Sequence, residues 1–174
     1  MILPSKLNKG DQVLIIAPAR KVEISSLEAA EKLLSDWGLI PIRSKNLLSN
    51  NGIFSGTDLE RKKDLQWALD HPEAKAIWCY RGGYGSIQLV EELNPSKFLQ
   101  HPKWIIGFSD ITVLHCFSNI ILNGHESELK LTQKEAASRV ARFSEQGREL
   151  ATEIQKLTLE KRSLQENIQQ NNKD

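Results

Sequence analysis

Short apolar runs alternate with segments of helical periodicity through the first 127 residues of the chain. The apolar runs have the length of buried strands and lie at 12–17, 39–42, 74–80 and 104–107. Apolar residues recur at helical spacing between and after these runs, over 25–37, 57–70, 86–93 and 111–122. This alternation predicts an α/β fold in which helices cover both faces of a parallel sheet.

Residues with strong capping preferences mark the ends of the first two helices. The sequence Ser25-Ser26-Leu27-Glu28 resembles a capping box, and Gly38 stands where a helix C-cap belongs. Thr57 or Asp58 is expected to cap the helix that runs to Asp70. These signals define the boundaries that we expect for both helices.

The character of the sequence changes near residue 127. Every tryptophan, tyrosine, proline and histidine lies before this point, whereas later residues are rich in Glu, Lys, Arg, Gln and Leu. The later apolar positions alternate in steps of four and three and give two heptad sets, Val140, Gly147, Ile154, Lys161 and Ile168 at a, and Ala136, Phe143, Leu150, Leu157 and Leu164 at d. We expect a globular domain at 1–127 and a long helical, coiled-coil-like tail at 128–174. The tail either pairs two chains into a homodimer through 136–168 or folds back on the domain as an amphipathic helix.

The chain carries little net charge, and its composition is ordinary for a globular protein. Its 23 Lys and Arg residues nearly balance its 22 Asp and Glu residues, so the formal net charge is +1. Hydrophobic residues make up 40% of the chain, and no apolar run is long enough to span a membrane. Composition therefore indicates neither a nucleic-acid partner nor a membrane partner. The N-terminus lacks the charged and apolar regions of a signal peptide, so we expect a cytoplasmic location.

A serine stands at the turn between the fourth apolar run and the helix that follows it. Residues 105–112 read Ile-Ile-Gly-Phe-Ser-Asp-Ile-Thr, which predicts a strand, a sharp turn with Ser109 at its apex, and a helix. This order is typical of a nucleophile elbow, and Gly107 is the small residue that such a turn needs. Ile111 occupies the place of the second glycine in the G-x-S-x-G pattern, so the pattern is incomplete. Ser109 is therefore either a nucleophile or the N-cap of its own helix.

A glycine-rich turn, Arg81-Gly82-Gly83-Tyr84-Gly85-Ser86, follows the third apolar run. Glycines let the backbone approach a ligand closely and leave N–H groups free to bind an anion. The turn matches neither a P-loop nor the G-x-G-x-x-G pattern. Arg81 either pairs with a substrate carboxylate or forms a surface ion pair. In a parallel sheet, this turn and 107–110 lie at the carboxyl ends of strands, where α/β proteins bind ligands.

Four groups of motifs occur in one order between residues 3 and 127 and together resemble a known family. They are LNKGD at 7–11 with IAP at 16–18, GTD at 56–58 with Arg61, RGGYGS at 81–86, and GFSDIT at 107–112 with Leu114 and His115. In this combination the chain resembles the N-terminal domain of the LD-carboxypeptidase family. These serine peptidases are related to muramoyl-tetrapeptide carboxypeptidase and to the microcin C immunity peptidase.

The resemblance implies a flavodoxin-like domain that hydrolyses a peptidoglycan peptide without metal or cofactor. The family removes the terminal D-alanine from murein tetrapeptides by cleaving an L-to-D bond. Ser109 matches the nucleophile of the family. The backbone N–H of Asp110 and one N–H from Gly82 or Gly83 would match its oxyanion hole. Arg81 and Tyr84 would line the substrate groove.

The resemblance ends near residue 127, which limits the activity that we expect. In the family, the Glu and His that complete the catalytic triad come from a second domain, and this chain has no histidine beyond His125. His115 follows Ser109 by six residues, about 9 Å along a helix, and is expected to be a core or helix-surface residue. We therefore expect a nucleophile domain that is incomplete or inactive as an isolated chain. The alternative is a non-catalytic binding or dimerisation module.

Overall fold

The structure, a computed structural model, describes residues 3–125 without a gap, and then 127, 128, 130–135, 138, 145, 153, 155 and 156. The chain divides into two compact units, Met1–Glu126 and Ser127–Asp174. All labelled strands and helices belong to the first unit. The heptad positions at 136–168 lie outside the described residues, so the coiled coil stays a prediction.

A parallel sheet of four strands forms the centre of the first unit, as the apolar runs predict. The strands follow the order β2-β1-β3-β4 and comprise β1 (Gln12–Ile16), β2 (Ile40–Arg43), β3 (Ala76–Cys79) and β4 (Trp104–Ile106). Every neighbouring pair is parallel, with Leu14 opposite Ile42 on one side and Ile77 on the other. Parallel strands require crossover connections, and helices make them here.

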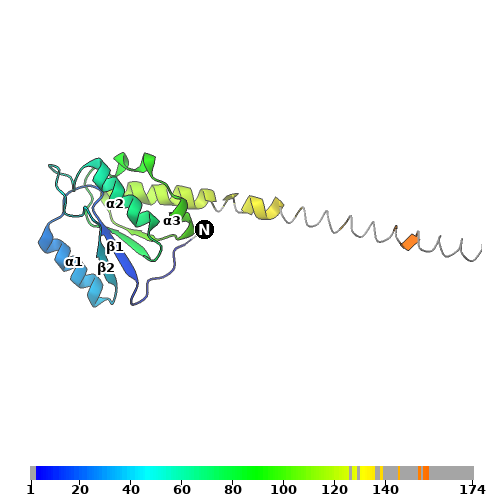
Figure 1. Ribbon diagram of the computed structural model, residues 1–174, viewed down its shortest axis with the longest axis horizontal. Coiled ribbons are helices and arrows are strands. Elements are labelled where there is room, and N and C mark those ends of the chain that lie inside the picture. Colours follow the sequence, from blue (N-terminus) through cyan, green and yellow to red (C-terminus); the bar gives the residue numbers. More distant parts are fainter. Residues whose placement is uncertain are drawn as a thin grey trace, which may run out of the picture. The chain divides into compact units, whose positions relative to one another are not determined.

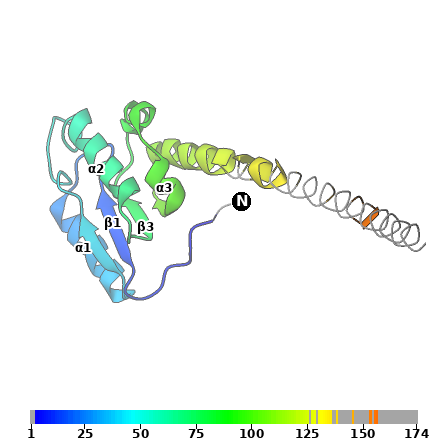
Figure 2. The same ribbon diagram turned by 45° about the vertical axis from the view of Figure 1, so that its right-hand side comes forward.

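Helices lie on both faces of the sheet (Figure 1). The labelled helices are α1 (Ile24–Asp36), α2 (Asp58–Asp70) and α3 (Ser96–Gln100), and residues 112–125 form a further helix. Figure 2 shows α1 on one face, with α2 and α3 on the other. Within the described part of the chain, every helix is too short or too polar to span a bilayer.

Strand β1 contributes to two separate hydrophobic clusters because its side chains alternate between the faces of the sheet. Leu14 and Ile16 pack in the cluster that includes residues of α2, α3 and the helix 112–125. Val13 and Ile15 pack in a smaller cluster with residues of α1. All four side chains are fully buried, which explains why the sequence of β1 is a continuous apolar run.

The first helix begins earlier than the sequence predicts. Its N-cap is Glu23 without a side-chain capping bond, so the capping box expected at 25–28 is wrong. The N–H of Leu27 donates to the carbonyl of Glu23, and this bond closes the first turn of the helix. The C-terminal prediction is confirmed, because Gly38 adopts a φ of +79° and its N–H donates to the carbonyl of Ser35.

The single helix expected at 86–93 is wrong. This segment forms two 3₁₀ turns, η1 (Ser86–Gln88) and η2 (Val90–Glu92). The segment between Gly85 and Pro95 is so short that an α-helix there would close few i→i−4 hydrogen bonds. Single i→i+3 turns satisfy its backbone groups instead. Helix α3, which follows Pro95, was not predicted at all.

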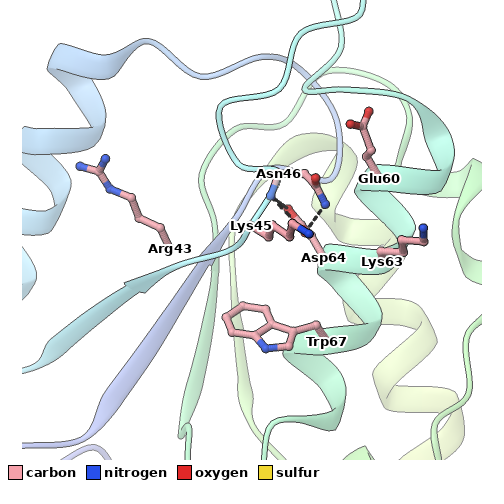
Figure 3. A pocket seen from close by; sticks show the side chains of 7 residues that line it. All are labelled: Arg43, Lys45, Asn46, Glu60, Lys63, Asp64 and Trp67. Atoms are coloured by element: carbon pink, nitrogen blue, oxygen red, sulfur yellow. Dashed lines mark hydrogen bonds between the residues drawn. The ribbon is translucent and has the colours of Figure 1, made fainter.

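Helix α2 begins at the predicted cap and fixes the chain that leaves β2. Thr57 and Glu60 form a reciprocal capping box, in which Glu60 accepts from the Thr57 N–H at 2.8 Å. This hydrogen bond lowers the pKa of Glu60. One turn further, the carboxylate of Asp64 accepts from the backbone N–H and the side-chain amide of Asn46 (Figure 3). The capping box and the Asn46–Asp64 hydrogen bonds thus hold the long 44–57 connection against α2.

A buried lysine connects the start of β4 to the end of α2. Lys103 is 2% exposed, and its Nζ donates to the carbonyls of Leu69 at 2.9 Å and His101 at 3.1 Å. The Leu69 carbonyl belongs to the last turn of α2, where carbonyl groups lack partners within the helix. Burial lowers the pKa of Lys103 from 10.5 to about 8, because it disfavours the charged form.

We expect the contribution of Lys103 to the free energy of unfolding to increase as the pH rises from 8 to 10.5. In this window the folded protein has released the proton and the unfolded chain still binds it, so stability rises with pH, by at most about 3 kcal/mol. Burial raises the pKa of the Cys79 thiol, which makes stability fall at alkaline pH and opposes this rise. Urea unfolding measures the free energy of unfolding of the parent and of Lys103→Met across this range. The Cys79 contribution is the same in both proteins, so it cancels in the difference between them. A pH-independent difference between the two proteins would contradict the prediction.

Candidate active site

The turn after β4 has the geometry of a strained elbow. Ser109 opens the 3₁₀ turn η3 (Ser109–Ile111), which continues into the helix 112–125. Its φ is +59°, and no other non-glycine residue described by the structure has a positive φ. The left-handed conformation costs roughly 1–2 kcal/mol for an L-residue and exposes Ser109 at the end of the sheet. The N-cap of η3 is Phe108, without a side-chain capping bond, so the interpretation of Ser109 as the N-cap is wrong.

The departure from G-x-S-x-G has a packing explanation. A Cβ atom on Gly107 would lie 2.6 Å from Cγ2 of Ile111, so only glycine leaves room for that side chain. Ile111 is fully buried and belongs to the larger hydrophobic cluster. The elbow therefore needs its glycine before the serine, whereas an apolar residue after it anchors the turn in the core.

The glycine-rich turn lies directly against this elbow, as the strand order predicts. A Cβ atom on Gly82 would lie 2.9 Å from the carbonyl oxygen of Phe108, 3.2 Å from Cβ of Ser109 and 3.5 Å from the backbone N of Asp110. Gly82 is buried, whereas Ser109 is exposed. The structure thus brings together Ser109, Gly82 and the Asp110 backbone. Asp110 lies in the first turn of its helix, where backbone N–H groups have no partner within the helix.

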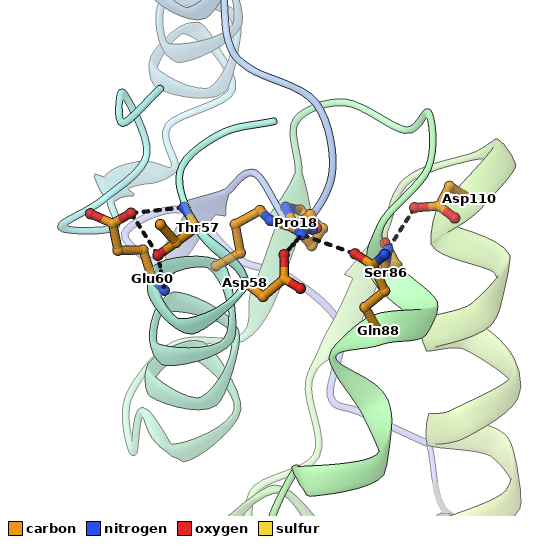
Figure 4. Close-up of polar contacts among 8 residues, drawn as sticks. Pro18, Thr57, Asp58, Glu60, Ser86, Gln88 and Asp110 are labelled. Atoms are coloured by element: carbon orange, nitrogen blue, oxygen red, sulfur yellow. Dashed lines mark hydrogen bonds and ion pairs between the residues drawn. The ribbon is translucent and has the colours of Figure 1, made fainter. Parts of the chain in front are cut away.

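A side-chain hydrogen bond holds the two turns together. The carboxylate of Asp110 accepts from the backbone N–H of Ser86 at 2.9 Å (Figure 4). The side chain and the backbone of Asp110 thereby have separate roles in the site. Its carboxylate holds the end of the glycine-rich turn, and its backbone N–H stays beside Ser109.

A buried arginine of α2 contacts the glycine-rich turn. Arg61 of α2 donates to the carbonyl of Pro18 at 2.5 Å and to the side chains of Asp58 at 2.5 Å and Gln88 at 3.2 Å, three groups that converge in Figure 4. Its guanidinium also lies 2.5 Å from the position of a Cβ on Gly85. Arg61 therefore joins the ends of β1 and β3 to the start of α2. The sequence motif included Arg61, but no local pattern indicated this role.

The three remaining cationic or aromatic neighbours lie at the surface. Arg81 is exposed and forms no ion pair with any described residue. The side chain of Tyr84 is 53% exposed. Sequence reasoning missed Arg20, whose Nε lies 2.8 Å from the position of a Cβ on Gly83. Its place four residues after the end of β1 was the available signal, because the carboxyl ends of β1 and β3 lie at the same edge of the sheet.

No described side chain is placed to activate Ser109. None forms a hydrogen bond with the Ser109 hydroxyl, and Nε2 of His115 lies 3.1 Å from the carbonyl oxygen of Ile105. His115 thus contacts the edge strand β4, as expected for a helix residue behind the elbow. Among the described residues, no group of three or more His, Cys, Asp or Glu side chains is arranged to hold a metal ion.

Comparison with known proteins places this elbow in a family. A family model described as the LD-carboxypeptidase N-terminal domain matches residues 13–125, which is more than half of the chain. The chain belongs to the LD-carboxypeptidase family. The match contains both Ser109 and the glycine-rich turn, and the resemblance to this family that the sequence indicated is confirmed.

Relatives of this LD-carboxypeptidase domain are much longer than the chain itself. The murein tetrapeptide carboxypeptidase of Pseudomonas aeruginosa is 36% identical over 104 residues, which are 59% of this chain and 34% of that protein. The crystal structure of an MccF-like protein from Bacillus anthracis has 32% identity and a TM-score of 0.62, covering 66% of this chain and 36% of that one. The muramoyltetrapeptide carboxypeptidase of Oxalobacter formigenes has 29% identity and a TM-score of 0.53, covering 59% and 34%. The chain spans about a third of the length of the relatives it matches.

Replacing Gly82 with alanine is expected to separate the two turns. The new methyl group must displace the Phe108 carbonyl or the Ser109 side chain, which costs about 1–3 kcal/mol of unfolding free energy. Gly124→Ala is the matched control, because a Cβ there meets nothing within 4 Å. Urea unfolding of both variants measures the difference. Equal stability of the two variants would show that the turns are not in close contact.

Proposed function

We propose that this domain carries the nucleophile and the oxyanion hole of a serine LD-carboxypeptidase. The proposal rests on one observation above all: exposed Ser109 has a φ of +59° at a strand-to-helix turn, inside the region that matches the family. The proposed substrate is a murein tetrapeptide, because the name of the Pseudomonas aeruginosa relative specifies it. The proposed product is the peptide shortened by its terminal D-alanine.

In the proposed reaction, the Ser109 hydroxyl oxygen attacks the carbonyl carbon of the L-to-D bond and passes its proton to a general base. The backbone N–H of Asp110 and an N–H from Gly82 or Gly83 stabilise the negative charge that develops on the carbonyl oxygen. The C–N bond then breaks, and D-alanine leaves with a proton from the base. Water then attacks the acyl-serine ester while the base takes its proton. The ester C–O bond breaks, and the Ser109 oxygen leaves with a proton from the base.

The proposed groove runs over the exposed side chains beside the elbow. Arg81 and Tyr84 are exposed at the glycine-rich turn and are available to the peptide. An arginine suits the terminal carboxylate that every carboxypeptidase substrate carries, because its planar fork matches a carboxylate. The base and the acid that orients it are proposed to come from polypeptide outside the described residues.

A chimera tests this proposal without requiring the isolated chain to be active. Residues 13–125 replace the matching segment of the Pseudomonas aeruginosa relative, whose remaining part supplies its own catalytic groups. Mass spectrometry of a murein tetrapeptide incubated with the chimera is expected to show loss of one D-alanine. A folded chimera that binds the tetrapeptide and releases no D-alanine would contradict a catalytic role for Ser109.

A non-catalytic binding module is the second candidate. The observation that favours it is the absence of a described base beside Ser109, since His115 contacts the Ile105 carbonyl instead. In that case the full chain binds the tetrapeptide without hydrolysing it, and Ser109→Ala leaves the affinity nearly unchanged. Pairing of two chains through 136–168 and a cytoplasmic location stay predictions from the sequence.

A further inference from the structure

A cleft lies away from Ser109, between α2 and the chain that leaves β2. Its volume is about 660 Å³, within the usual range for small-molecule sites. Glu60, Lys63, Asp64 and Trp67 line it from α2, and their spacing places them on one face of that helix. Arg43, Lys45 and Asn46 line the other side (Figure 3). Strands β2 and β4 are opposite edges of the sheet, so this cleft is separate from the elbow.

The acidic groups of the cleft are already occupied. Asp64 accepts three hydrogen bonds from Asn46, at 2.8 to 3.3 Å. Glu60 accepts from the N–H and the hydroxyl of Thr57 at 2.8 and 2.9 Å. These contacts hold both carboxylates in the framework of α2 and its connection.

One of the three cationic groups is also occupied. Arg43 donates to both carboxylate oxygens of Glu31 at 2.5 and 2.6 Å, and these hydrogen bonds lower the pKa of Glu31. Lys45 and Lys63 are exposed, and neither forms an ion pair with a described residue. Lys63 lowers the pKa of Glu60 only through its charge, after the larger effect of hydrogen bonds. The two cationic groups of the cleft that remain available to a ligand are therefore the ammonium groups of Lys45 and Lys63.

Trp67 adds a flat apolar surface to the same cleft. Figure 3 shows its indole reaching from α2 toward the strand side of the cleft. The side chain is 37% exposed, and one edge is fixed by a T-shaped contact with His71, at 5.6 Å between ring centroids. A ring held in this way offers a face for stacking at little further entropic cost.

We propose that this cleft binds a small anion that carries a flat ring, with the ring on Trp67 and the negative group at Lys45 and Lys63. The combination of a tryptophan face with two unpaired ammonium groups suits an aromatic phosphate or carboxylate better than an uncharged ligand. The proposal is independent of the reaction at Ser109, because no lining residue belongs to the elbow.

Titration of the full chain with phenyl phosphate tests this proposal. The readout is the indole N–H signal of Trp67 in a two-dimensional proton–nitrogen NMR spectrum, assigned with Trp67→Phe among the four tryptophans of the chain. A saturable shift of this signal is expected, and the double variant Lys45→Gln/Lys63→Gln should weaken binding about tenfold or more. Both lysines are exposed, so the variant should keep the parent spectrum elsewhere.

Lys62→Gln is the matched control, since Lys62 neighbours Lys63 on α2 but pairs with Glu92. Its affinity for phenyl phosphate should equal that of the parent. Inorganic phosphate and benzyl alcohol, which each carry half of the proposed ligand, should both bind more weakly than phenyl phosphate. Equal binding of either one, an unaffected double variant, or the absence of a Trp67 shift would each overturn the proposal.

Discussion

Replacing Ser109 with alanine is expected to lower D-alanine release by the chimera by about four orders of magnitude or more. The variant loses the atom that forms the acyl intermediate but keeps the backbone N–H groups that surround it. Binding of the tetrapeptide should change little, because a single exposed hydroxyl contributes little to the ground-state complex. The loss should therefore appear in kcat and not in KM, as measured by mass spectrometry over a range of substrate concentrations.

Ser118→Ala provides the control for this measurement. Its hydroxyl donates to the carbonyl of His115 at 3.0 Å, on the helix that follows the elbow. Ser118 is half-buried and lies outside both the elbow and the glycine-rich turn, so removing its hydroxyl should leave the rate within a factor of about two. Hydrolysis at the parental rate by the Ser109→Ala chimera would mean that another residue is the nucleophile.

Replacing Arg61 with methionine is expected to lower the free energy of unfolding by about 3 kcal/mol. Methionine fills part of the space, but it leaves the Pro18 carbonyl without its charged donor and releases Asp58 and Gln88. It also removes the guanidinium from the face of Phe54, which lies 4.7 Å away. Arg61→Lys should recover only part of the loss, because one ammonium group cannot replace the planar fork.

Urea unfolding followed by tryptophan fluorescence measures this loss, since all four tryptophans precede residue 127. Lys62→Met is the control, because the adjacent Lys62 is paired with Glu92, whose side chain is 75% exposed. A surface pair of this kind contributes at most about 1 kcal/mol. Equal stability of Arg61→Met and the parent would show that the hydrogen bonds of Arg61 to Pro18, Asp58 and Gln88 do not support the fold.

Features that depend on neighbouring residues were predictable from the sequence. The run at 12–17 predicted β1 because a strand buried on both faces needs apolar residues at every position. Thr57 predicted the start of α2 because its hydroxyl reaches the N–H of Glu60 three residues later. Gly38 predicted the end of α1 because a φ of +79° favours glycine.

Features that depend on competition between local and distant partners were not predictable in this way. The segment 86–93 has helical periodicity, yet it forms two 3₁₀ turns in place of one α-helix. The helix α1 begins at Ile24, before the position that its serines indicated. The contacts of Arg20 and Arg61 with the glycine-rich turn were not predicted, because they join segments that are far apart in the sequence.

The sequence by itself determined the α/β class, the parallel strands, the position of Ser109 at a turn and, through its motifs, the LD-carboxypeptidase family. Tertiary structure alone decided that Gly82 packs against Ser109, that Arg61 lies against Gly85, and that a cleft opens between α2 and the chain that leaves β2, beside Trp67. The physical reason is the range of the interactions. Periodicity, capping and turn preferences act over a few residues, whereas these contacts form only when the sheet brings the ends of separate strands together.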